Sequence, residues 1–515
     1  MDRRRGQIVA IGFVVALVAG CGSAPPPTPP PSASIAAGPT PPPIASTTPT
    51  AAPTTATPVS WSDCGNGFEC GNVLVPLDYG DPAGGTVLIA LIRLPAPGQA
   101  DRIGSLIVNP GGPGESGVDF VRDAAGLLFP DAIRARFDIV GFDPRGVGRS
   151  SPIRCVDNLD HFLAADANPD TPAELATLLA GERTFVAGCE RRNAAMLPAV
   201  GTENVARDLD VIRGAVGDRA LTYIGFSYGT LIGSIYAGLF PDRIRALVLD
   251  GAIDPTVDLA GLRKAQAVAF EGALDRFLAD CSRRTACPFQ NGGKPGPAFD
   301  ALMRRIDASP LPATLLNDPR PVGPTYAWGA VLGALYAPQG WSILAQALTL
   351  AQRGDGSYLL ALADPLNGRN PDGSYSNLID ADSSVTCLDF PGPRDPTAYE
   401  TEARSFAKVA PRLGSLFAYN DIECAFWPVA PDRTPAAATA PGAPPILVVG
   451  STGDPATPYA WAQALARQLG SGVLLTRTGE GHTGYAFSGC VRTAVDAYLL
   501  NLALPPTGTT CPTGP

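Results

Sequence analysis

The sequence predicts an α/β protein built on a doubly wound, mostly parallel sheet. Short apolar runs suited to buried strands, such as Leu106–Val108 and Leu221–Ile224, alternate with helical segments between about residues 70 and 255. Two further runs of this kind, Ile446–Gly450 and Val473–Leu475, lie near the C-terminus. At 515 residues the chain is also long enough for a core domain with an insertion. We therefore expect one sheet assembled from two separated parts of the chain.

The most informative motif is the segment GFSYG, Gly225–Gly229, directly after the apolar run that ends at Ile224. A G-x-S-x-G sequence between a strand and a helix is typical of a nucleophile elbow, where small residues on both sides of the serine permit a sharp turn. The residues that follow, Thr230–Ala237, are small and apolar, as a closely packed helix requires. The motif predicts an α/β-hydrolase fold with Ser227 as nucleophile; a turn that merely contains two glycines is the alternative.

A serine nucleophile needs a base, normally a histidine held by a carboxylate. The chain has only two histidines, and α/β-hydrolases order these residues as serine, acid, histidine. His482 follows Ser227 and stands in a glycine-rich loop after the last strand-like run, so it is the predicted base. His161 precedes Ser227 and is expected on a helix surface.

Two aspartates are candidates for the acid. Asp454 lies in a loop after the run that ends at Gly450, 28 residues before His482, whereas Asp250 ends the strand-like run Ala246–Leu249. We favour Asp454, because its strand immediately precedes the one that leads to His482. Asp250 remains the alternative, and its other expected role is to cap the turn that follows.

Acyl transfer also requires donors for the developing oxyanion, which come from the residue after the nucleophile and from a loop after an early strand. The loop Asn109–Gly114 fits that position, so the N–H groups of Gly112 and Tyr228 are the predicted donors. Arg145, in the next loop, is expected to be a structural bridge.

These motifs share a pattern with a known family. The segments 109–114, 143–146, 225–229, 453–458 and 481–483 resemble those of the actinobacterial secreted tripeptidyl aminopeptidases, a branch of the prolyl-iminopeptidase-like α/β-hydrolases. The chain is also similar to mycobacterial cell-envelope serine proteases and carboxylesterases, from about Trp61 to the C-terminus. Prolyl iminopeptidases proper have a histidine at the start of the oxyanion loop. Asn109-Pro110 stands there instead, so strict specificity for proline is not expected.

The resemblance implies a hydrolase that acts on peptides or esters without a cofactor. It also implies that acidic residues near the lid recognise a free α-ammonium group, and Glu115 and Asp389 are the candidates in this sequence. A binding lipoprotein that kept the fold but lost activity is the alternative of a different class.

The N-terminus predicts export. Three arginines precede the apolar stretch Ile8–Val18, and the segment Leu17–Cys21 resembles a lipoprotein signal box in which Cys21 is diacylated. We therefore predict a signal peptide over residues 1–20, a Pro/Thr/Ser/Ala-rich tether over residues 21–60, and an outward-facing enzyme anchored to the membrane at the cell envelope. An uncleaved membrane anchor is the alternative. The net charge of −10 gives no support to nucleic-acid binding.

The cysteine count agrees with export. Eleven cysteines minus the lipidated one leave an even number in a compartment that permits disulfides. Spacing alone does not fix the connectivity, but each sequential pair is a sensible local cross-link: Cys64 with Cys70, Cys155 with Cys189, Cys281 with Cys287, Cys387 with Cys424 and Cys490 with Cys511. No metal site is expected, because histidine partners and close Cys-x-x-Cys pairs are missing.

The folded part divides by its character into three segments. Residues 61–255 and 441–515 are the expected core, and residues 256–440 are a largely helical lid inserted before the last two strands, with helical patterns over 265–278 and 343–350. A lid at this place would cover Ser227 and select substrates.

Overall fold

The computed structural model describes residues 57–513. The predicted signal peptide, Cys21 and the tether up to residue 56 lie outside the described residues. Within residues 57–513, no helix is both long and apolar enough to cross a membrane.

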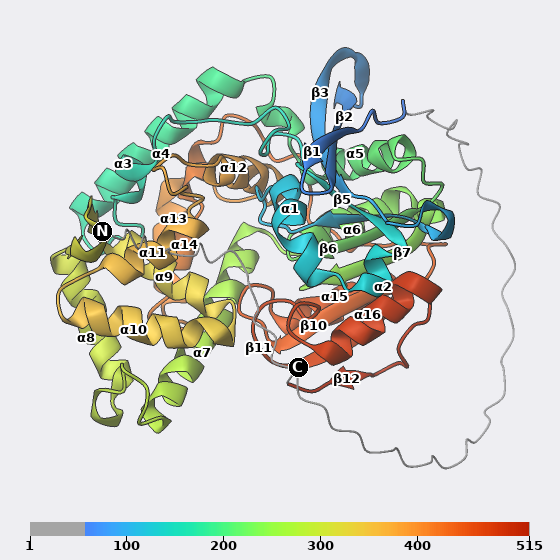
Figure 1. Cartoon of the computed structure of the whole chain (residues 1–515). Helices are drawn as coiled ribbons and strands as arrows, with labels where there is room; N and C mark the ends of the chain where they lie inside the picture. Colours follow the sequence, from blue (N-terminus) through green and yellow to red (C-terminus); the bar gives the residue numbers. More distant parts are fainter. Residues whose placement is uncertain (1–56, 514–515) are drawn as a thin grey trace, which may run out of the picture. The chain divides into compact units, whose positions relative to one another are not determined.

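A ten-stranded sheet forms the core, and it is parallel except at one end (Figure 1). In spatial order its strands are β1 (Ser62–Gly65), β2 (Phe68–Asp78), β3 (Asp81–Leu94), β5 (Phe137–Phe142), β4 (Gly104–Asn109), β6 (Leu221–Phe226), β7 (Ile244–Asp250), β10 (Ile446–Gly453), β11 (Gly472–Glu480) and β12 (Thr510–Cys511). The pairs β1–β2, β2–β3 and β3–β5 are antiparallel, and all the others are parallel. The predicted fold class is confirmed; the two-residue strand β12 was not anticipated.

The central strands are uniformly apolar because helices cover both of their faces. Every residue of β4, β5 and β6 is buried, and successive side chains alternate between two core clusters: Ile107 joins one, while Leu106 and Val108 join the other. One face is covered by α5 (Thr202–Ala215), α6 (Gly229–Leu239) and α15 (Tyr459–Gln468). The other is covered by α1 (Gly117–Leu128), α2 (Asp131–Arg134) and α16 (Gly489–Asn501).

The segment between β7 and β10 is mostly helical and lies beside the sheet (Figure 1). Its helices are α7 (Leu259–Arg283), α8 (Pro295–Ala308), α9 (Pro324–Leu335), α10 (Trp341–Gln352), α11 (Ser357–Leu366), α12 (Leu378–Asp389), α13 (Pro396–Phe406) and α14 (Gly414–Tyr419). A small antiparallel sheet, β8 (Leu311–Ala313) with β9 (Asp318–Val322), interrupts them. The two helical patterns expected over 265–278 and 343–350 correspond to α7 and α10.

Two helices from the earlier part of the chain precede α5: α3 (Asp160–Leu163) and α4 (Pro172–Asn193). Leu178 of α4 packs in a cluster with residues of α13 and of the 3₁₀ helix η7 (Ile422–Phe426). The remaining 3₁₀ helices are η1 (Gln99–Asp101), η2 (Leu197–Ala199), η3 (Pro241–Arg243), η4 (Asn291–Gly293), η5 (Thr314–Leu316) and η6 (Pro338–Gly340). The helical part beside the sheet is therefore assembled from two segments of the chain.

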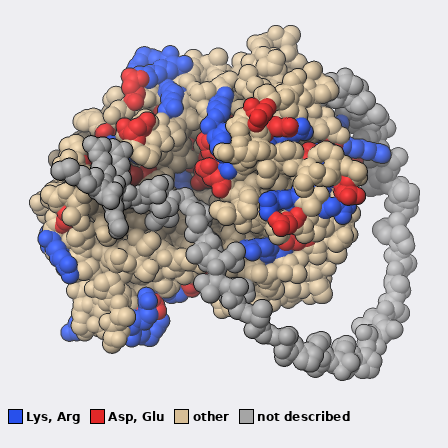
Figure 2. Space-filling view, in the orientation of Figure 1, with Lys and Arg blue, Asp and Glu red and all other residues tan. Residues whose placement is uncertain are grey.

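Hydrogen bonds, ion pairs and disulfides connect these elements. Arg145 is completely buried and binds Asp208 and the carbonyl oxygens of Pro76, Leu77 and Ala199, which confirms a structural role. His161 is exposed on α3, as predicted. All five predicted neighbour disulfides are formed. Basic and acidic side chains are interspersed over the face shown in Figure 2, most of which is uncharged.

Candidate active site

Ser227 occupies the corner between β6 and α6, with a left-handed φ of 52°. Both flanking glycines are sterically required: a Cβ at Gly225 would lie 2.4 Å from the carbonyl oxygen of Gly229, and one at Gly229 would lie 2.8 Å from Oδ1 of Asn109. A non-glycine residue with positive φ stores backbone strain and persists only where its surroundings hold it. Here the Ser227 N–H donates to the carbonyl oxygen of Asp250 at 2.9 Å. The geometry is that of a nucleophile elbow.

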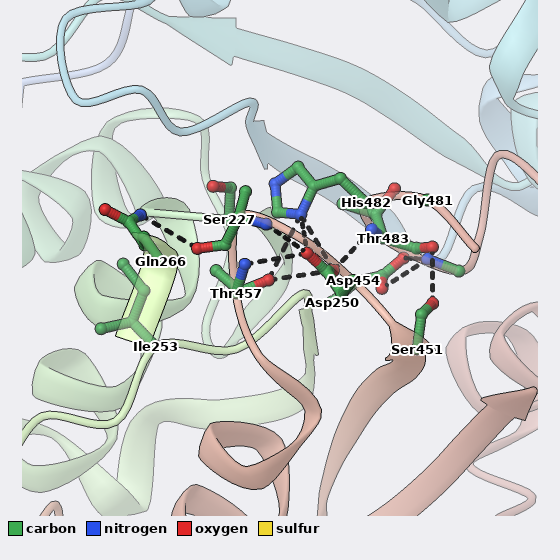
Figure 3. Close-up of polar contacts among 12 residues, drawn as sticks. Ser227, Asp250, Ile253, Gln266, Ser451, Asp454, Thr457, Gly481, His482 and Thr483 are labelled. Atoms are coloured by element: carbon green, nitrogen blue, oxygen red, sulfur yellow. Dashed lines mark hydrogen bonds and ion pairs between the residues drawn. The ribbon is translucent and has the colours of Figure 1, made fainter. Parts of the chain in front are cut away.

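His482 and Asp454 are paired beside this corner (Figure 3). Nδ1 of His482 lies 2.9 Å from each carboxylate oxygen of Asp454. Backbone N–H groups of Ala456, Thr457 and Thr483 also donate to this carboxylate, at 2.8 to 3.1 Å. These donors fix the orientation of the carboxylate, and Nδ1 of His482 carries the proton toward it.

The opposite ring nitrogen of His482, Nε2, is buried and has no hydrogen-bond partner among residues 57–513. Figure 3 shows this edge of the ring turned to the side of Ser227. Burial alone would lower the pKa of His482, but the carboxylates of Asp454, Asp250 and Glu115 raise it above its usual value. An imidazole with one nitrogen fixed on a carboxylate and the other free is suited to accept a proton from a serine hydroxyl.

Asp250 lies beside this pair but has a different partner. Its carboxylate accepts the N–H groups of Gly484 at 2.8 Å and of Tyr485 at 2.8 Å, which anchors the loop after His482. Burial raises the pKa of Asp250 to about 6. Of the two acids considered from the sequence, the structure brings Asp454 into hydrogen-bond contact with His482.

The oxyanion loop lies directly against the elbow. A Cβ at Gly111, which has a φ of 105°, would lie 2.6 Å from the carbonyl oxygen of Phe226 and 2.9 Å from the nitrogen of Tyr228. Gly111 thus makes the close approach, while its neighbour Gly112 faces Glu115. The N–H groups of Gly112 and Tyr228 form no hydrogen bond within the described part of the chain. Both remain available as donors to a ligand.

The helical insertion contacts His482 directly. The carbonyl oxygen of Tyr336, just after α9, accepts the His482 N–H at 2.7 Å, and the Tyr336 ring meets the imidazole edge-on at 5.4 Å. Phe270 of α7 packs on Tyr336 in turn, at 5.6 Å between ring centroids. Arg276 of α7 also forms an ion pair with Glu480, two residues before His482, at 2.7 Å. The position of the base therefore depends on the insertion as well as on the sheet.

Carboxyl groups gather next to the oxyanion loop. The side chain of Glu115 is exposed to solvent, yet enough protein surrounds it for desolvation to raise its pKa. Asp382 of α12, whose nitrogen would lie 3.0 Å from a Cβ at Gly114, has its pKa raised to about 7, mainly by burial. Neither side chain has a hydrogen-bond or ion-pair partner among residues 57–513. Arg263, whose charge lowers the pKa of Asp382 against the effect of burial, binds Asp421, and Glu423 has its pKa raised to about 8 by burial.

Asp389, the other acid predicted to meet a substrate ammonium group, is differently placed. Its side chain has no accessible surface, and its oxygens accept hydrogen bonds from Thr202 and from the hydroxyl of Tyr228. The carboxylate is therefore directed at the residue after the nucleophile and is not offered to a ligand. Asp382, which no motif indicated, lies on the same helix and is partly exposed. Only the packing of α12 against Gly114 distinguishes the two positions.

Thr457 is a further residue that the motifs did not indicate. Its hydroxyl donates to Asp454 at 3.0 Å and lies 3.2 Å from Nδ1 of His482. It is held there because its N–H also donates to Asp454. The only sequence signal for Thr457 is its position in a tight loop, three residues after Asp454.

Comparison with known proteins agrees with this geometry. Residues 104–291 match the family model described as "alpha/beta hydrolase fold", and residues 410–511 match that described as "TAP-like protein". Over 486 residues the chain is 40% identical to the serine protease Hip1 of Mycobacterium tuberculosis, which covers 90% of this chain and 92% of that protein.

This chain belongs to the α/β-hydrolase family.

Two further relatives match this chain over a similar length. Carboxylesterase B of M. tuberculosis is 39% identical over 481 residues, covering 89% of this chain and 91% of its own. The tripeptidyl aminopeptidase of Streptomyces lividans is 33% identical over 458 residues, covering 86% and 84% respectively. The family resemblance predicted from the motifs is confirmed, and it extends across the core and the insertion.

Proposed function

We propose that this α/β-hydrolase is a serine peptidase that forms an acyl-enzyme on Ser227. His482 acts as the general base, Asp454 holds its imidazole, and the N–H groups of Gly112 and Tyr228 bind the oxyanion. One observation carries the proposal: Nδ1 of His482 is fixed on Asp454, while Nε2 has no hydrogen-bond partner among the described residues and lies beside the elbow. The serine protease and aminopeptidase relatives support the same activity.

The reaction follows from these positions. The Ser227 hydroxyl gives its proton to Nε2 of His482 as its oxygen bonds to the scissile carbonyl carbon. Negative charge then develops on the carbonyl oxygen, where two backbone N–H groups stabilise it. The imidazolium, stabilised by Asp454, returns the proton to the leaving amine as the C–N bond breaks. Water then attacks the acyl-enzyme by the same proton route and releases the acid.

The carboxyl groups beside the oxyanion loop support exopeptidase action at a free N-terminus. Within residues 57–513, Glu115 and Asp382 form no ion pair, and burial raises the pKa of both, although the charge of Arg263 opposes this at Asp382 and that of His482 opposes it at Glu115. An α-ammonium group would supply the missing counter-charge and two or three charge-assisted hydrogen bonds. The relative named tripeptidyl aminopeptidase is consistent with this recognition.

Carboxylesterase activity is the second candidate, favoured by the relative named carboxylesterase B. Both reactions use the same acyl-enzyme, so the leaving group decides between them. A panel of free and N-blocked aminoacyl, dipeptidyl and tripeptidyl amides, together with short and long acyl esters, tests the choice. The proposal expects the highest kcat/KM for unblocked peptides; a preference for N-blocked peptides or for esters would reject exopeptidase action.

We further propose that the exported protein is anchored through an acylated Cys21 at the cell envelope. The support is the lipoprotein signal box and the uncharged tether of residues 23–60. Metabolic labelling with a palmitate analogue should label the wild-type chain and not the Cys21→Ala variant. A wild-type protein that is found unacylated, with its N-terminus elsewhere in the tether, would overturn anchoring.

A further inference from the structure

The side chain of Tyr228 ends in a buried polar network. Its hydroxyl donates to Oδ2 of Asp389 and lies 2.5 Å from the hydroxyl of Thr202. Thr202 also donates its N–H to Oδ1 of Asp389 at 3.0 Å. All three side chains are almost completely buried. The network therefore joins three elements: the elbow, the start of α5 and the last residue of α12 in the insertion.

Asp389 is subject to opposing electrostatic effects. It stands at the C-terminal end of α12, where the helix dipole disfavours a negative charge, but its carboxylate also accepts the first N–H of α5, where the dipole favours one. Its carboxylate has no ion-pair partner in the part of the chain that the structure describes; Arg433 donates to its backbone oxygen at 2.8 Å, and the charge of Arg433 opposes the burial that raises the pKa of Asp389. Burying an ionised carboxylate without a paired cation is costly, so hydroxyl and N–H donors must offset the loss.

The elbow supplies a reason to keep the acid. Ser227 is strained, and the peptide that follows it carries the Tyr228 N–H. On the side of the sheet, the Ser227 N–H is held by Asp250. Tyr228 follows Ser227 in the same turn. The network holds the hydroxyl at the end of the Tyr228 side chain. The Tyr228 ring also packs edge-on against Phe390, with 6.4 Å between the ring centroids. A change in the orientation of the Tyr228 backbone would therefore break buried hydrogen bonds.

We propose that Asp389 is a positioning residue that holds the oxyanion donor of Tyr228 through the Tyr228 hydroxyl. The helical insertion thereby becomes part of the catalytic centre, because α12 fixes the oxyanion donor while the carbonyl of Tyr336 holds the N–H of His482. The Cys387–Cys424 disulfide lies two residues before Asp389 and ties α12 to η7. Lifting the insertion away as a whole would break both of these contacts.

This inference rests on the proposed role of Ser227, and three variants test it. Tyr228→Phe removes the hydroxyl but keeps the ring and the N–H. Asp389→Asn removes the charge. Tyr236→Phe is the matched control, because the Tyr236 hydroxyl also donates to a buried aspartate, Asp210, at 3.1 Å, but at the far end of α6. Each variant is assayed with one ester substrate, with a peptide boronate that forms a tetrahedral adduct on the serine, and by thermal melting.

Loss of a complete oxyanion donor costs about 10²- to 10³-fold in kcat, so a displaced donor should cost about 10- to 100-fold. We expect Tyr228→Phe to lower kcat by this factor at nearly unchanged KM, and to weaken boronate binding equally. Tyr236→Phe should change both by less than about twofold. The double variant of Tyr228→Phe with Asp389→Asn should be no slower than the slower single variant, since both act through one hydrogen bond.

Wild-type kcat in Tyr228→Phe, a rise in KM alone, or additive losses in the double variant would each overturn the inference. Tyr228→Phe decides the matter even if Asp389→Asn fails to fold. Failure of the underlying mechanism gives a separate result: Ser227→Ala would then retain turnover. If Ser227→Ala is inactive while Tyr228→Phe is fully active, only the positioning role is lost.

Discussion

Replacing Asp454 by Asn should remove most of the catalytic rate by placing the His482 proton on the wrong nitrogen. Both carboxylate oxygens of Asp454 accept backbone N–H groups as well as Nδ1 of His482. An amide retains one acceptor, and these N–H groups compete for it, which leaves the NH₂ group facing the imidazole. Nδ1 must then accept, the ring proton moves to Nε2, and His482 can no longer take the proton of Ser227.

The expected loss in kcat is about 10⁴-fold, equivalent to roughly 5.5 kcal/mol in activation free energy. The assay is steady-state hydrolysis of an unblocked peptide amide and of an ester, with circular dichroism to verify folding. Asp250→Asn is the matched control, because that carboxylate binds the N–H groups of Gly484 and Tyr485 but not the imidazole. It should cost less than about 10²-fold. A 10⁴-fold loss in Asp250→Asn with activity retained in Asp454→Asn would refute the reasoning.

Three further predictions concern pH, the ammonium site and the elbow. Neighbouring carboxylates raise the pKa of His482 above its usual 6.5, and only the neutral ring acts as base. The rise of kcat/KM with pH should therefore have its midpoint above pH 6.5. A midpoint below that pH would contradict the assignment. Glu115→Gln or Asp382→Asn should raise KM for unblocked peptides by about 10-fold or more without raising KM for a neutral ester. The control Glu400→Gln, at a half-exposed carboxylate of α13 that pairs with Arg404, should change neither. Equal effects on both substrates would rule out ammonium recognition. Gly229→Ala should destabilise the fold by about 1–3 kcal/mol in denaturant titration and slow turnover, since its Cβ would lie 2.8 Å from Asn109. Gly181→Ala, in open space on α4, is the control and should be neutral or stabilising; equal stability of the two variants would show that the elbow is not tightly packed.

The parts of the site that follow from chain order could be predicted from the sequence. The elbow sequence fixes the residues around Ser227, because only glycine fits the contacts made at positions 225 and 229. Two histidines and a fixed order of roles leave His482 alone as base. Asp454 was favoured over Asp250 because of its neighbouring strand, and it is the acid that the structure pairs with His482.

The roles that depend on how distant segments pack could not be predicted. Asp389 is a predicted contact of a substrate ammonium group, but the direction of its side chain depends on how α12 meets the start of α5, 187 residues away in sequence. The position of Asp382 beside the oxyanion loop could not be predicted, because no local sequence feature links the two. In that loop the close approach to the elbow falls on Gly111, because its position relative to Phe226 depends on the pairing of β4 with β6.

The central claim, that Ser227 is the catalytic nucleophile, is tested most directly by labelling with a fluorophosphonate and mapping the modified peptide by mass spectrometry. The account predicts a single modified residue, Ser227, with labelling and turnover both abolished in Ser227→Ala while its melting temperature stays near that of the wild type. Modification of another residue, or most of the wild-type turnover in a folded Ser227→Ala variant, would contradict it.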